Sequence, residues 1–164
     1  MSLTDTQRFM LASRAGGWAL DAQRRAQWPA DRGVDFEAAH FVALSLTHLG
    51  RCLVLLKGTS PALDEATSVF CKAMTAANLR DARNALEHEE DYLAGVGREE
   101  KLRGDFDTWP VCGTEGSWST GLMGTDRLEQ IRVLGKSYSF GAALDAIPSV
   151  LNALSSWLTG FRGW

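Results

Sequence analysis

The segment from about Asp35 to Lys57 constrains the fold most, because it has the length of a helix and is apolar almost all round. Asp35 can cap its start and Gly58 can end it. Such a helix is either central to a bundle or covered by a partner chain. Its large apolar residues are Phe36, Phe41, Val42, Leu44, Leu46, Leu49, Leu53, Val54, Leu55 and Leu56. We expect a helical bundle and also a homodimer, because one small bundle does not readily cover this much apolar surface.

Other stretches also have helical character. Residues 4–27 have apolar residues at helical spacing, with Thr4 or Asp5 as a cap, and the glycine pair at 16–17 is expected to let another helix approach closely. Ser60-Pro61 opens a helix that runs to about Ala76, since Pro is favoured at the first helical position. The chain then either breaks near residues 77–78 or continues unbroken into a motif helix that begins at Leu79 and ends at Gly95 or Gly97.

The amino-acid composition changes after residue 97, where a charged connector precedes a segment rich in Gly, Ser, Thr and aromatic residues. Strands are expected at 117–123, 129–134 and 137–140, with Gly135-Lys136 as a two-residue hairpin turn. Residues 141–158 form the last helix, which Pro148 either kinks or begins. We therefore predict a mainly α fold: a bundle of four or five helices with a small antiparallel hairpin or sheet before the C-terminal helix. Residues 1–164 form one domain, with a helical core at 1–97, a β-containing excursion at 105–140 and the last helix at 141–158.

Composition limits the class of protein. The formal net charge of −3 does not favour a strong non-specific nucleic-acid binder, although it leaves room for a local basic site. No early segment resembles a signal peptide, and no apolar run has the length that we expect of a bilayer span, so a cytoplasmic protein without membrane contact is expected. Three cysteines without a close pair argue against disulfides, and Cys52 and Cys71 are expected to fill core positions.

The motif helix concentrates the polar chemistry of the chain. Residues three and four apart share a helix face, so Asp81, Asn84, His88 and Asp91 form one polar stripe. Leu79, Ala82, Leu86 and Leu93 form an apolar stripe beside it, and Arg83 can pair with Glu87.

Arg83-Asn84-Ala85-Leu86-Glu87-His88 resembles the Arg-Asn-x-x-x-His signature of the HEPN superfamily, helical domains of defence and RNA-processing systems. Many members are metal-independent endoribonucleases in which two motif helices meet across a dimer axis. The resemblance implies proton transfer by His88, stabilisation of phosphate charge by Arg83 and an orienting role for Asn84. It also implies RNA as a ligand and a protein partner such as an antitoxin. Toxin-type members often carry Tyr two residues after the His, where this chain has Glu90.

These residue types suit cleavage of RNA by its own 2′-hydroxyl. Imidazole can accept or return a proton near neutral pH, and guanidinium binds non-bridging phosphate oxygens. The neighbouring carboxylates favour the imidazolium form of His88, yet they also repel phosphate, and Arg80 is the available counterweight.

A second polar strip lies on the apolar helix and consists of Glu37, His40, His48 and Arg51. These residues either line a groove beside the motif helix or are core-edge residues bonded within the chain. Glu37-x-x-His40 is a spacing found in di-iron bundles, but it occurs once, and about 12 Å of helix separates His40 from His48. We therefore expect no metal and no cofactor.

Three functions remain open. The leading hypothesis is a HEPN-like RNA endonuclease or RNA-binding module that acts as a dimer through Arg83, Asn84 and His88. The second is a non-catalytic HEPN-like interaction domain in which these three residues form a hydrogen-bonded structural cluster. A weaker third is a metal-dependent bundle enzyme that uses the histidines.

Overall fold

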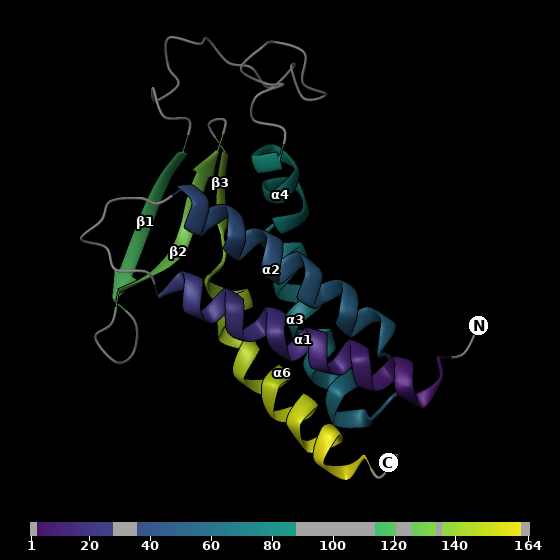
Figure 1. Ribbon diagram of the computed structural model, residues 1–164. Helices are drawn as coiled ribbons and strands as arrows, with labels where there is room; N and C mark the ends of the chain where they lie inside the picture. Colours follow the sequence, from purple (N-terminus) through teal and green to yellow (C-terminus); the bar gives the residue numbers. More distant parts are fainter. Residues whose placement is uncertain (1–2, 28–35, 88–113, 121–125, 134–135, 162–164) are drawn as a thin grey trace.

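The computed structural model describes residues 3–27, 36–87, 114–120, 126–133 and 136–161 (Figure 1). In these ranges the chain is mainly helical, with a three-stranded antiparallel sheet before the C-terminal helix, and this confirms the predicted fold class. The elements are α1 (Asp5–Ala26), α2 (Phe36–Leu55), α3 (Pro61–Ala76), α4 (Leu79–Glu87), β1 (Thr114–Thr120), β2 (Asp126–Val133), β3 (Lys136–Ser139) and α6 (Gly141–Gly160).

Local capping explains where two of the helices begin. The Thr4 hydroxyl accepts a hydrogen bond from the Gln7 backbone N–H at 3.3 Å, and the Gln7 side chain accepts one from the Thr4 N–H at 2.9 Å. This reciprocal arrangement satisfies two donors at the start of α1. At the start of α3 the Ser60 hydroxyl accepts from the Leu63 N–H, and Pro61 is the first helical residue. Both starts agree with the sequence prediction.

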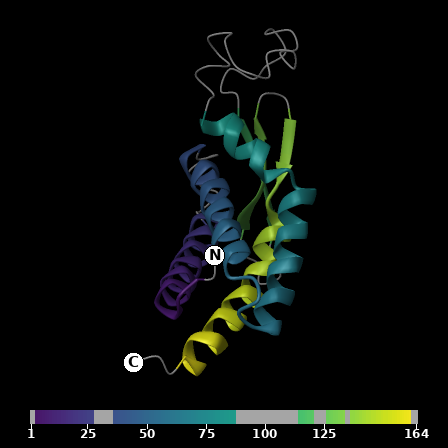
Figure 2. The ribbon, with the colours of Figure 1, turned by 90° about the vertical axis from the view of Figure 1, so that its right-hand side faces the viewer.

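The antiparallel α1–α2 pair and the α3–α6 pair make up the bundle (Figures 1 and 2). Helix α2 also contacts α3 and α4, as expected of a central helix. Helix α1 buries a stripe of small residues at helical spacing, and small side chains let neighbouring helices approach closely. The stripe consists of Ala12, Ala15, Ala19, Ala22 and Ala26.

Glycines 16 and 17 do not have the close-packing role expected of them. A Cβ atom built at either position meets nothing within 4 Å. The alanine stripe carries the close helix contact instead. Trp18 lies in the middle of α1.

Helix α6 is longer than predicted and runs through Pro148 to Gly160. Pro148 is exposed and lies inside the helix, so it does not mark the first turn. The buried face of α6 includes Leu144, Ile147 and Leu154 and packs along α3. The large buried residues of α3 are Leu63 and Phe70.

The sheet has the order β1-β2-β3, and all neighbours are antiparallel. The β1–β2 register shifts between Ser117 and Trp118, which marks a bulge. Val133 pairs with Lys136, so the hairpin turn consists of residues 134–135, one residue earlier than predicted. Leu128 and Tyr138 join the sheet to the bundle core.

From the sequence we expect no apolar run long enough to span a bilayer, but one stretch of α2 has that length. Ala38–Leu55 is long and apolar enough to cross a membrane by length and composition, with a mean hydropathy of 1.4. Half of this stretch is buried in the bundle, and the core helix of a soluble protein can have the same length and composition. The absence of membrane contact therefore stays a prediction.

Candidate functional site

Helix α4 carries the part of the motif that the structure describes. Leu79 and Ala82 are fully buried, whereas Arg80 is exposed and Arg83 and Asn84 are half-buried. The helix therefore turns its apolar side to the core and its polar side, which carries Arg80, Asp81 and Arg83, outward. It contacts α2, α3, β2 and β3 at the end of the bundle where the sheet lies (Figures 1 and 2).

A break in the chain sets the direction of α4. Asn78 has φ +51°, a left-handed conformation that Asn tolerates better than most residues. Its side-chain amide donates a hydrogen bond of 2.7 Å to the Asp81 carboxylate. Of the two predicted alternatives, the break near residues 77–78 is therefore the one observed.

Several predicted site residues lie outside the described residues. These are His88 and Asp91, together with the expected helix end at Gly95 or Gly97 and the charged connector. Glu37 belongs to the first turn of α2, but its side chain is not described. The structure therefore places Arg80, Arg83 and Asn84 on one short helix and leaves the position of the imidazole of His88 as a prediction.

The second polar strip turns partly toward α1. The His48 ring stacks on the indole of Trp18, with ring centroids 4.7 Å apart and an interplanar angle of 17°. His40 is half-buried beside Phe41, and Arg51 is exposed. The contact between His48 and Trp18 ties that histidine to the α1–α2 pair.

A polar cluster between α1 and α2 was not foreseen from the sequence. The fully buried Ser45 hydroxyl donates a hydrogen bond of 2.8 Å to the Asp21 carboxylate. Asp21 also pairs with Arg24 at 3.0 Å and with Arg25 at 3.8 Å. The Arg25 guanidinium lies over the Phe41 ring at 4.7 Å, within the range of a cation–π interaction. The cluster links α1 to α2 through polar and cation–π contacts, so we interpret its role as structural.

Two cysteines have altered acidity without forming a reactive site. Burial raises the pKa of the Cys52 thiol, and Arg14 opposes that shift. Burial also raises the pKa of Cys71, with Lys57 acting in the opposite direction. Both thiols are therefore predominantly protonated at neutral pH, unlike the thiolates that act as nucleophiles. Cys52 is buried in the core as predicted, and Cys71 packs against the core while half-buried.

Among the residues that the structure describes, no group of three His, Cys, Asp or Glu side chains is placed to hold a metal ion. Comparison of the chain with models of known protein families, with curated proteins and with solved structures gives no match.

Proposed function

We propose that the protein is an RNA-binding module that acts as a homodimer and cleaves RNA without a metal ion, with α4 as the contact helix. The observation that most directly supports this proposal is the pair of arginines on the outward side of α4. Arg80 is exposed and Arg83 and Asn84 are half-buried, while Leu79 and Ala82 anchor the opposite side in the core. An RNA strand passing this side would meet two guanidinium groups and a side-chain amide, groups that suit phosphate oxygens. The exposed Asp81 carboxylate beside Arg80 opposes this attraction and is hydrogen-bonded by Asn78.

The proposed reaction has three roles. The His88 imidazole takes the proton from the attacking 2′-hydroxyl, and Arg83 offsets the charge that develops on the phosphorus-bound oxygens. The partner's His88 returns a proton to the departing 5′-oxygen. The products are a 2′,3′-cyclic phosphate and a 5′-hydroxyl, so no water or metal is required in the cleavage step.

The proposed homodimer draws support from apolar side chains left outside the core. Phe41 and Leu55 lie fourteen residues apart on α2, close to four helical turns, and so share a side of that helix. Leu55 keeps 57% of its surface exposed and Phe41 keeps 38%. A second copy that covers this side would account for the apolar character of α2 on the surface as well as in the core.

Purified protein incubated with structured and unstructured RNA in excess EDTA tests the proposal. We expect cleavage that survives chelation and leaves cyclic phosphate ends. His88→Ala should slow cleavage by about 10²–10⁴-fold, the usual contribution of a positioned proton-transfer group. Arg83→Ala should weaken both RNA binding, measured by fluorescence anisotropy, and cleavage.

Arg24→Ala is the matched control, because Arg24 is an exposed arginine on α1 whose partner is a carboxylate three residues away. It should bind and cleave RNA like the parent. An equal loss in Arg24→Ala and Arg83→Ala would mean that only general positive charge matters. Absence of both binding and cleavage in the parent protein would refute the proposal.

A second function, a non-catalytic interaction domain, has one observation in its favour. Arg83 is only partly exposed and already interacts within the chain. If Arg83 and Asn84 serve the fold alone, Asn84→Ala should lower the melting temperature while the parent shows no activity on RNA. Retained thermal stability in Asn84→Ala, with weakened RNA binding, would favour the RNA function instead.

A further inference from the structure

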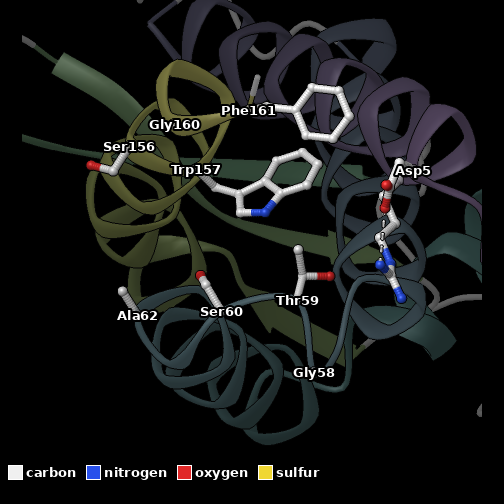
Figure 3. Close-up of a pocket in the computed structure, with 10 residues that line it drawn as sticks. Asp5, Gly58, Thr59, Ser60, Ala62, Ser156, Trp157, Gly160 and Phe161 are labelled. Atoms are coloured by element: carbon white, nitrogen blue, oxygen red, sulfur yellow. Dashed lines mark hydrogen bonds and ion pairs between the residues drawn. The ribbon is translucent and has the colours of Figure 1, made fainter. Parts of the chain in front are cut away.

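An open groove lies at the end of the bundle away from α4 (Figures 1 and 3). It is formed by the first turns of α1, the α2–α3 connection with the start of α3, and the last turn of α6. Its volume is about 700 Å³, which lies within the range of small-molecule sites in proteins. Arg80, Arg83 and Asn84 are not among the described residues that line it.

Aromatic rings form one wall of the groove. Trp157 and Phe161 contact each other with centroids 5.2 Å apart, and Phe161 also contacts Phe9 of α1 at 5.7 Å. Figure 3 shows the Trp157 indole between the Phe161 ring and the side chains of Thr59 and Ser60. Within the described ranges, the indole N–H of Trp157 donates no hydrogen bond. The wall therefore offers a surface for a planar ring and a donor at its edge.

Among the lining residues that the structure describes, the opposite wall carries one cation, Arg8, and one anion, Asp5. Arg8 lines the groove and uses one guanidinium nitrogen to contact the Asp5 carboxylate at 3.2 Å. A guanidinium carries five N–H donors, so this single contact leaves donors for a ligand. Helices α1 and α3 both begin at this groove, and their N-terminal dipoles favour negative charge there. The Thr4 and Ser60 side chains cap the two starts, and Asp5 and Asp64 lie in the two first turns, so Arg8 is the donor that the groove offers to a ligand.

We propose that this groove binds a small planar aromatic anion. The ring of the ligand stacks against Trp157, and its carboxylate or phosphate takes donors from Arg8 at the start of α1. Asp5 competes with the ligand for the guanidinium, so it sets the affinity from within the site. This binding site is separate from α4 and does not depend on the proposed RNA function.

Isothermal titration with two pairs of probes tests the proposal. Uridine 5′-monophosphate and indole-3-acetate carry a planar ring with a phosphate and a carboxylate respectively. Uridine and indole-3-acetamide are their counterparts without the anion. At least one anionic probe should bind, and it should bind more tightly than its neutral counterpart. Preference for the nucleotide would assign a phosphate-bearing ligand, and preference for indole-3-acetate would assign a carboxylate.

Two variants should change the affinity in opposite directions. Arg8→Ala should weaken binding about tenfold or more, as expected for loss of a hydrogen bond to a charged group. Asp5→Asn should tighten binding, because it removes the competing charge while keeping a similar shape. Trp157→Phe keeps a ring but removes the indole N–H, and it should weaken binding to a smaller extent than Arg8→Ala.

Arg24→Ala is again the matched control, because its i,i+3 ion pair with Asp21 lies on the same helix but outside the groove. Its affinity for the bound probe should equal that of the parent. The proposal is overturned if neither anionic probe binds at millimolar concentration. It is also overturned if Arg8→Ala and Arg24→Ala lose equal affinity, or if Asp5→Asn weakens binding.

Discussion

Asp21 illustrates how a single carboxylate can join two helices. Its side chain is mostly buried at the α1–α2 contact, yet it has a hydroxyl donor in Ser45 and two arginine partners on its own helix. A buried charge is costly unless it is paired and hydrogen-bonded, and Asp21 meets both conditions. Trp18 and His48 stack one helical turn further along the same seam. These contacts fix how α1 and α2 lie against each other.

Gly17 provides a prediction at the residue scale. Because it lies inside α1 with open space around its Cα, Gly17→Ala should raise the free energy of unfolding by about 0.5–1 kcal/mol. Urea denaturation followed by circular dichroism measures this change. Gly58→Ala should have the opposite effect, since Gly58 has φ +81°. A destabilised Gly17→Ala variant would indicate that something does pack against this glycine.

At the scale of elements, the break between α3 and α4 decides which way the motif residues face. The backbone of Asn78 turns the chain, and its C=O accepts hydrogen bonds from the N–H groups of Asp81 and Ala82. The turn lets Leu79 and Ala82 reach the core while Arg80 faces solvent. A helix continuing straight from α3 would carry these residues away from α2 and the sheet.

Substitutions at Asn78 test this view. Asn78→Ala should lower the free energy of unfolding by about 1–2 kcal/mol, because Ala resists the left-handed conformation and cannot bond Asp81. Asn78→Gly keeps the conformation accessible and should cost less than Asn78→Ala. Chemical denaturation of the two variants beside the parent gives the comparison. Equal stability of all three proteins would show that the break is held by other contacts.

The helices and the sheet could be predicted because their sequence markers are local. Thr4, Ser60-Pro61 and Gly58 mark helix ends, and the Val133–Lys136 pair lies within one residue of the predicted turn. The Asp21–Ser45 and Trp18–His48 contacts could not be predicted, because they depend on how two helices far apart in sequence align. The groove at Arg8 and Trp157 could not be predicted for the same reason, because its walls come from segments far apart in sequence. Of the motif residues, the outward position of Arg80 and the helical setting of Arg83 and Asn84 agree with the predicted helix.

At the scale of the whole molecule, the two candidate binding regions, α4 and the groove at Arg8 and Trp157, lie at opposite ends of its long axis. Helix α4 and the sheet lie at one end, while the first turn of α1 and the last turn of α6 meet at the other (Figure 2). Between them, α2 exposes apolar side chains on a side that the bundle does not cover.

Leu55→Arg should separate the proposed dimer. A charge placed within an apolar contact raises the dissociation constant by about tenfold or more, so the variant should show the mass of one chain where the parent shows two. Size-exclusion chromatography with light scattering measures both masses. Val69→Arg on α3 is matched in exposure, since Leu55 and Val69 each keep 57% of their surface, and it should leave the parent mass unchanged. A parent protein of one-chain mass at tens of micromolar would contradict the dimer.

The packing of α3 against α6 has a consequence for synthesis on the ribosome. Helix α3 packs on α2, where Phe70 lies beside Gly50, and also along α6, which begins about 65 residues after α3 ends. At translation rates of about 5–20 residues per second, the surface of α3 that packs on α6 stays exposed for several seconds before α6 has been synthesised. The nascent chain should therefore attract holding chaperones during this interval, and release should follow the emergence of the final helix.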